Sequence, residues 1–178
     1  MNKTAVFDAL CACLGLDRDS ADAIALIHEA YAEPENAPRP PRNRNVLYWY
    51  ARQDPASDPV STEYDAVPGG MCLHTPVVYT TLKYQLVIVC YGPACEEYAQ
   101  RIRAMLYLDG TGFPRKILRE AGIFPVPDPP QPVVGYEEEG AMWRKRADLV
   151  VSLRVRDEQQ APTRNSLLSG PEVFMHMS

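Results

Sequence analysis

The chain has 178 residues, of which 46% are hydrophobic, enough to bury one substantial core without disulfide bonds. The net charge of -5 argues against a protein whose main task is to bind nucleic acid, because phosphate binding requires a basic surface. The sequence contains no run of about 18 apolar residues and no secretory signal pattern, so we expect a soluble protein made in the cytoplasm, without membrane contact.

Two short helices are predicted at the N-terminus. The first covers residues 2–14, and Gly15 ends it. The second begins at an N-cap, Asp19 or Ser20, and its apolar stripe extends to Tyr31. Both helices are short enough to be marginal in isolation, so we expect them to pack on other elements.

The next region is predicted to form strands. Asn45–Arg52 is rich in aromatic and branched residues, which is typical of a strand. Val60–Val67 and Met71–Tyr79 flank Pro68-Gly69-Gly70, which predicts a hairpin-like arm. Such an arm has little of its own chain to pack on, so we expect it to contact a neighbouring subunit. The candidate interface residues on it are Val60, Thr62, Tyr64, Val77 and Tyr79.

A strand, a tight turn and an amphipathic helix are predicted between Thr80 and Leu106. The strand alternates with period two and becomes apolar on both faces toward Cys90. Gly92-Pro93 ends it, because glycine tolerates turn geometry and proline suits a first helical position. The helix then buries a stripe made of Cys95, Ala99, Ile102 and Leu106.

The C-terminal third contains a short helix and a long strand. The helix begins at Pro114 and stops at Gly122, after which Ile123-Phe124 return to the core. Met142–Arg156 has the clearest strand alternation in the chain, which predicts one buried and one charged face. The core face would carry Trp143, Ala147, Leu149, Val151, Leu153 and Val155. The polar tail beyond it ends in an apolar stub whose Phe174 is a further candidate interface residue.

This order of elements favours an α+β fold with a mainly antiparallel sheet, packed by helices, because regular helices do not separate the strands. We expect one domain over residues 1–156, followed by a C-terminal tail over 157–178. Within the domain, the predicted segments are the N-terminal helices 2–32, the strand and arm region 45–91, the helix 93–108 and the late strand 142–156.

The residues that could carry chemistry do not form a recognisable motif. The five cysteines lie in apolar runs without metal-finger spacing, so buried thiols are the simplest interpretation. The three histidines are far apart and lie in no metal-binding pattern. A nucleophilic pair of Cys90 with His74 remains an alternative, although no oxyanion motif surrounds it. We therefore predict no catalytic residues, no metal and no cofactor, and a protein that is not an enzyme.

Two charged stretches have structural and functional interpretations. The run of Glu137, Glu138 and Glu139 is typical of a solvated turn, with a cation site or paired carboxylates as the alternative. The basic stripe would blunt one face of the sheet or form a salt-bridged subunit contact, with phosphate binding as the alternative. It consists of Arg144, Lys145, Arg146, Arg154 and Arg156.

The sequence resembles the phage neck and tail terminator proteins between Pro38 and Arg156. The resemblance lies in the RPPRN-like proline linker before an aromatic strand, the block KYQLVIVCYGPACEEYAQRIRAML, the GIFPV segment and the late strand RKRADLVVSLRV. Two details match the family: the strand that ends in the Tyr91-Gly92 turn, and the arginine-bearing segment from Arg144 to Arg146 before the late strand.

The resemblance implies an α+β structural virion protein that forms a ring, typically a hexamer, in the neck or tail. Such a ring stops growth of the tail tube and joins the tail to the neck. Its partners would be copies of itself, the tail tube protein and a neck or connector protein, with DNA only as passing cargo. In this setting Glu137, Glu138 and Glu139 would face a partner or the lumen.

Two other functions remain open at the level of sequence. A head-completion or adaptor ring elsewhere in the neck would have the same fold and a different position. A small cysteine-dependent enzyme would need a pocket around Cys90, Cys95 or His74, and one thiol would then react rapidly with a mild alkylating reagent.

Overall fold

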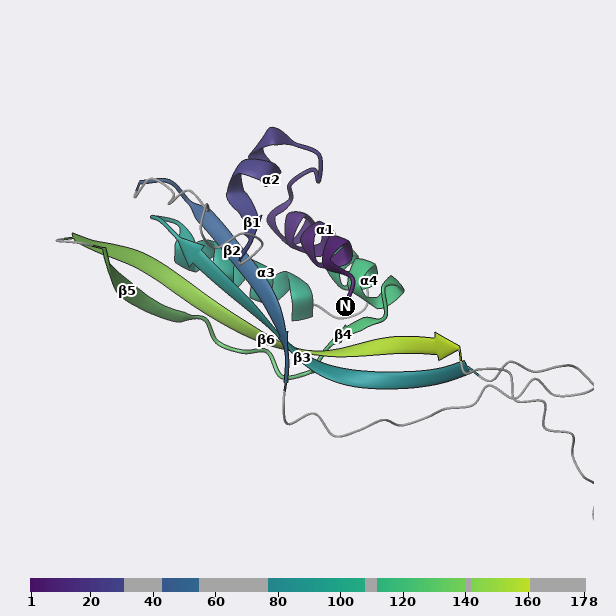
Figure 1. Cartoon of the computed structure of the whole chain (residues 1–178). Coiled ribbons are helices and arrows are strands. Elements are labelled where there is room, and N and C mark those ends of the chain that lie inside the picture. Colours follow the sequence, from purple (N-terminus) through teal and green to yellow (C-terminus); the bar gives the residue numbers. More distant parts are fainter. Residues whose placement is uncertain (31–42, 55–76, 108–111, 140–141, 161–178) are drawn as a thin grey trace, which may run out of the picture.

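The computed structural model describes residues 1–30, 43–54, 77–107, 112–139 and 142–160. This part of the chain forms four helices and six strands, whose arrangement is shown in Figure 1. In order, they are α1 (Lys3–Leu14), α2 (Ala21–Leu26), β1 (Ile27–Glu29), β2 (Val46–Gln53), β3 (Val77–Tyr91), α3 (Cys95–Tyr107), α4 (Phe113–Glu120), β4 (Ile123–Pro125), β5 (Val133–Glu139) and β6 (Met142–Gln160).

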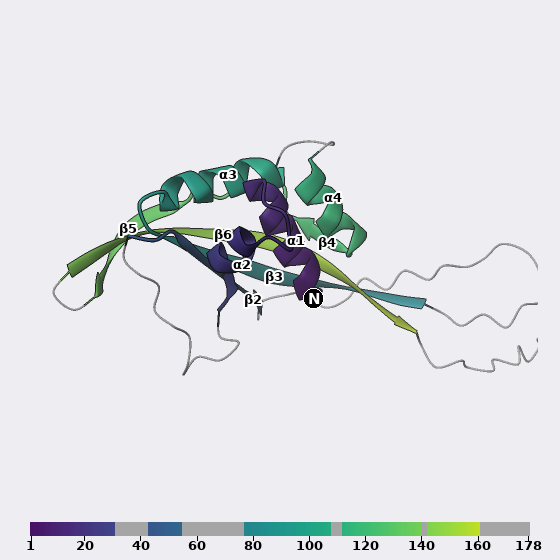
Figure 2. The ribbon, with the colours of Figure 1, turned by 90° about the horizontal axis from the view of Figure 1, so that it is seen from above.

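The strands form one six-stranded sheet in the order β1-β2-β3-β6-β4, and β5 also pairs with β6. β1 and β2 are parallel, and the other pairs are antiparallel. Figure 2 shows α1, α3 and α4 on the same face of this sheet. The predicted α+β fold is therefore confirmed, with a mixed sheet because of β1.

The N-terminal helices begin at side-chain caps, and the second is shorter than predicted. Asn2 Oδ1 accepts a hydrogen bond from Ala5 N at 3.1 Å, and Ser20 Oγ accepts one from Ala23 N at 3.1 Å. Helix α2 ends at Leu26 and not near Tyr31, because Ile27 leaves the helix to pair with Leu47 in the sheet. Burial of Ile27 against β2 overrides its helical spacing.

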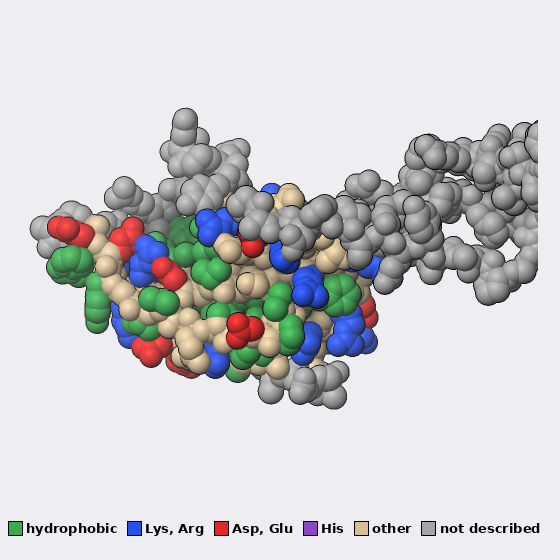
Figure 3. All heavy atoms as spheres, turned by 90° about the horizontal axis from the view of Figure 1, so that it is seen from below, with side chains coloured by type: hydrophobic (Ala, Val, Ile, Leu, Met, Phe, Trp, Pro, Cys, Tyr) green, Lys and Arg blue, Asp and Glu red, His purple; other side chains and the backbone are tan. Residues whose placement is uncertain are grey.

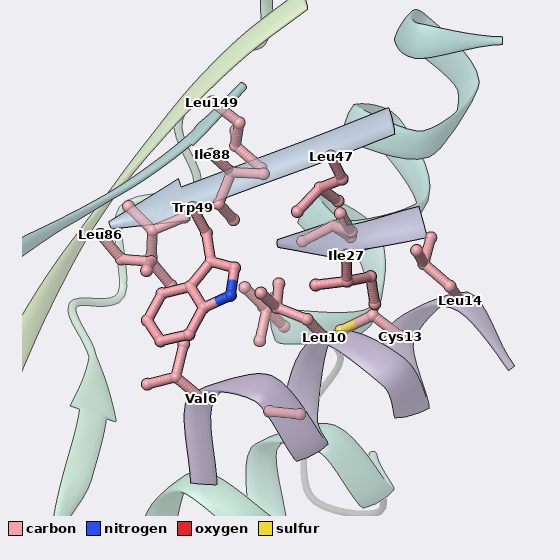
Figure 4. Close-up of a cluster of buried hydrophobic side chains, with 14 of the residues drawn as sticks. Val6, Leu10, Cys13, Leu14, Ile27, Leu47, Trp49, Leu86, Ile88 and Leu149 are labelled. Atoms are coloured by element: carbon pink, nitrogen blue, oxygen red, sulfur yellow. The ribbon is translucent and has the colours of Figure 1, made fainter. Parts of the chain in front are cut away.

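The core lies between the sheet and the helix layer. Trp49, Ile88 and Leu149 are cross-strand neighbours on three adjacent strands, and all are buried on the helix-covered face. Figure 4 shows Val6 and Leu10 of α1 pointing toward this row of side chains. The predicted stripe of α3, which includes Cys95, Ala99, Ile102 and Leu106, is buried in the same core.

The turn between β3 and α3 is the predicted one at Gly92, whose φ is +104°. Asn45 lies against this turn, and its Oδ1 accepts a hydrogen bond from Ala94 N at 3.0 Å. Residues from two distant parts of the chain thus fix the direction in which α3 leaves the sheet.

The first residues of β6 depart from the predicted alternation. Ala147, Leu149 and the later odd-numbered residues to Val155 are buried as predicted, but Trp143 is 67% exposed and Arg144 only 7% exposed. Trp143 shares the helix-side face with Ala147. Lys145 on the same face bonds to Glu96, near the N-terminal end of α3. Trp143 lies beyond that end. In the described part of the chain, no helix covers Trp143.

Three further predictions change in the structure. Glu137 to Glu139 lie in β5 and do not form a turn, because Glu139 pairs with Met142 to begin a hairpin with β6. Phe124 is 39% exposed and does not return to the core with Ile123. β6 continues to Gln160, beyond the strand end predicted at Arg156, because it pairs with the first residues of β3.

The arm predicted from Val60 to Tyr79 lies mostly outside the described residues, so it stays a prediction. The described chain instead shows β3 and β6 extending as a two-stranded ribbon (Figure 1). Residues 77–80 pair there with 157–160, beyond the registers of β2 and β4. No helix among the described residues is long and apolar enough to cross a membrane.

Candidate functional site

Glu137 of the acidic run takes part in contacts within the subunit. Its Oε2 accepts a hydrogen bond from the Tyr91 hydroxyl at 2.7 Å and one from Arg146 Nη1 at 3.2 Å. Arg146 Nε also donates to Asp148 Oδ1 at 3.0 Å. These bonds join β3, β5 and β6 on the face away from the helices, so Glu137 has a structural role at this place.

Arg144 is buried beside this network. Its guanidinium carbon lies 4.4 Å from the centroid of the Tyr91 ring, a cation–π contact. The Tyr48 ring meets Tyr91 edge-on, with centroids 6.1 Å apart. Arg144 Nε and Nη2 have no hydrogen-bond partner in the described chain. Three residues of the basic stripe therefore have different roles. Arg144 packs on an aromatic ring, and Arg146 forms ion pairs. Lys145 lies on the opposite face, where its Nζ is 3.2 Å from Glu96 Oε2.

The network shifts the pKa values of Glu137 and Tyr91. The Tyr91 hydroxyl, followed by Arg146, holds the pKa of Glu137 below its ordinary value despite partial burial. Burial, and then the bond to Glu137, raises the pKa of Tyr91. Glu137 therefore adds stability that is present above its unfolded pKa of about 4.3. That stability is lost as the pH falls through the lower pKa of the folded state.

We expect Glu137→Gln to destabilise the fold at pH 7 by less than about 1 kcal/mol, because the side chain is 46% exposed and its ion pair is screened. The difference from the wild type should shrink at an acid pH below the lowered pKa of Glu137, where the wild-type carboxyl is protonated too. Urea unfolding at both pH values measures this. Glu138→Gln is the matched control, because no bond of that kind is found for Glu138 in the described chain; equal effects of the two variants would contradict the assigned role.

An exposed apolar group lies on the hairpin formed by β5 and β6. Val133, Val134, Tyr136 and Trp143 are 68%, 40%, 66% and 67% exposed. β5 pairs on one side with β6, and its other edge has no partner strand among the described residues. Val134, Tyr136 and Glu138 share the helix-side face of the hairpin with Trp143, and Val133 lies on the other face, because Glu138 pairs with Trp143 and Val134 with Ala147. We call Val134, Tyr136, Glu138 and Trp143 the hairpin surface. An unpaired strand edge that carries aromatic side chains is typical of a protein-binding surface.

Sequence reasoning missed the hairpin surface. It assigned Trp143 to the core and the glutamates to a turn, and it did not recognise β5. The signal that could have found it is the sequence VVGYEEE, a short apolar run with a charged end, a few residues before Trp143. Two strands separated by so short a loop predict a hairpin.

The predicted interface residues lie partly beyond the described structure. Val60, Thr62, Tyr64 and Phe174 lie outside the described residues. Val77 and Tyr79 belong to β3, where they pair with Gln160 and Glu158. The structure thus places these last two on the two-stranded ribbon, away from the hairpin surface, and their contact with a neighbour stays a prediction.

The described cysteines have the character of core residues. Cys11, Cys13, Cys90 and Cys95 are free and buried. Burial raises the pKa of Cys13 and of Cys90 to about 12, which opposes formation of a nucleophilic thiolate. The described residues contain no group of three or more His, Cys, Asp or Glu side chains that could hold a metal ion. His74 lies outside them, so its pairing with Cys90 is untested.

Comparison with known proteins gives one family. The family model described as phage neck terminator protein matches residues 4–169, which is most of the chain. It spans the helices, the whole described sheet and the hairpin surface. The comparison with curated proteins gives no match.

Proposed function

The chain belongs to the phage neck terminator protein family, whose role is structural, and from this we infer that it forms a ring that caps the tail tube and joins the tail to the head connector. The family match over residues 4–169 is the observation that carries this proposal. The match supports a structural component of the virion neck, and we propose that the protein is not an enzyme.

The architecture supports self-assembly. A ring of identical subunits needs two different surfaces on each subunit, one that binds the preceding copy and one that binds the next. Among the described residues, one edge of β5 has no partner strand, and the hairpin surface exposes two aromatic side chains. Apolar groups of this kind are costly to leave in water and gain most from contact with another protein.

The remaining parts of the proposal concern partners and copy number. We propose a homo-hexamer that contacts the tail tube protein on one side and a neck or connector protein on the other. DNA passes through the central channel without being gripped, consistent with the net charge of -5. Glu138 and Glu139 are the acidic residues of β5 that we expect to face a partner or the lumen.

The native mass of the full chain tests the ring. We expect light scattering of concentrated protein to give about six times the chain mass of 19.9 kDa, with negative-stain images showing an axial hole. Purified tail tubes should bind this ring at one end. A protein that stays monomeric at high concentration, with and without tubes, would contradict the proposal; binding to the connector alone would favour a head-completion or adaptor ring.

A further inference from the structure

A second exposed aromatic side chain lies at the start of α4, where Phe113 is 65% exposed. Basic residues follow it along the helix: Arg115, Lys116 and Arg119, of which Lys116 forms an ion pair with Glu120. We call Phe113 and these three basic residues the α4 surface.

The two surfaces lie near different parts of the same strand. β5 pairs with residues 142–148 of β6, whereas β4 pairs with residues 153–155. Figures 1 and 2 show β5 at one end of the sheet and α4 with β4 toward the other. The surfaces do not overlap, so one subunit can use both at once.

Their charges are opposite in sign. Next to the hairpin surface, acidic residues outnumber basic ones: Glu138 and the exposed Glu96 and Glu97 in the first turn of α3 lie near one basic residue, Lys145. On α4, basic residues outnumber acidic ones. Figure 3 shows acidic side chains beside apolar and some basic ones at the end where β5 lies, and several basic side chains toward the other end. Like surfaces of two copies would repel each other, whereas unlike surfaces attract.

We propose that the hairpin surface of one subunit binds the α4 surface of the next, so that Tyr136 and Trp143 pack against Phe113 of the neighbour. This inference rests on the proposed ring and names the two surfaces that close it. The contact is head-to-tail, because each copy offers a different surface to each neighbour, and such contacts produce rings when the rotation closes. Aromatic side chains at the centre would supply most of the affinity, with the charges setting orientation and encounter rate.

Two single substitutions separate this contact from other modes of assembly. We expect Trp143→Ser and Phe113→Ser each to weaken self-association at least tenfold in sedimentation velocity experiments, because each removes one side of the contact. Ile24→Ser is the matched control: Ile24 of α2 is 61% exposed and lies outside both surfaces, so its loss should leave assembly unchanged. All three residues are exposed, and circular dichroism should show that each variant folds.

Mixing the two variants gives the decisive result. The Trp143→Ser chain keeps an intact α4 surface and the Phe113→Ser chain keeps an intact hairpin surface, so an equimolar mixture should form dimers that do not close into rings. Added salt should dissociate these dimers, since the contact joins opposite charges. Rings that persist in both variants, normal assembly of Phe113→Ser alone, or a mixture that remains monomeric would overturn the pairing while the ring itself stands. A wild-type chain that never assembles would overturn the ring as well.

Discussion

Replacing Gly92 with alanine should destabilise the fold by about 3 kcal/mol, because the backbone and the space at this position both exclude a side chain. The φ of +104° lies in a region that side chains with a Cβ rarely adopt. A Cβ at Gly92 would lie 2.6 Å from Asn45 Oδ1, 2.7 Å from Arg44 O and 2.8 Å from Asn45 Cα. Two of these atoms belong to the backbone, so a change of side-chain rotamer cannot relieve the clash.

Urea unfolding at a fixed protein concentration measures the effect, which keeps any contribution of assembly constant. The matched control is Gly135→Ala in β5, where a Cβ would meet no atom within 4 Å. That variant should change the free energy of unfolding by less than about 1 kcal/mol. If Gly92→Ala changes the free energy of unfolding as little as the control does, then the turn at the start of α3 is not fixed in the way described.

Leu149→Ala should lower the free energy of unfolding by about 3 kcal/mol, within the range for deletion of a fully buried leucine side chain. Leu149 lies at the centre of β6, opposite Ile88, and is completely buried between the sheet and the helices. Removing its isobutyl group would leave a cavity that the surrounding strands are too constrained to fill.

Val150→Ala is the matched control, because Val150 is the next residue of the same strand, on the opposite face, and is 41% exposed. We expect it to cost less than about 1 kcal/mol. Thermal and urea unfolding of the two variants would give the comparison directly. Similar losses for both would mean that the face away from the helices is as closely packed as the core.

Substitutions inside the subunit and substitutions on the two exposed surfaces should affect assembly differently. Gly92 and Leu149 act inside the subunit, so their variants should lose assembly only to the extent that they lose the fold. Trp143 and Phe113 are exposed, so their variants should lose assembly while the subunit stays folded. This difference allows effects on folding and on ring formation to be measured separately.

Local pattern determined much of what the structure shows. The alternation in β6 identifies Ala147 to Val155 as one buried face, and the helical spacing from Cys95 to Leu106 identifies the buried stripe of α3. The turn at Gly92 follows from residue type. These features depend on near neighbours in the chain, which is why the sequence contains them. The same stretches carried the family resemblance, and the family match confirms it.

Tertiary structure alone decided the features that depend on which segment covers another. Ile27 fits a helical stripe, yet it forms β1 because a buried partner strand lies beside it. Trp143 has the correct period for the core, yet it is exposed because α3 begins too far along the sheet to cover it. The alternation of β6 predicts that Arg144 is exposed to solvent, yet it is buried against Tyr91. Periodicity tells which side chains share a face, but the path of distant segments decides whether that face meets protein or water.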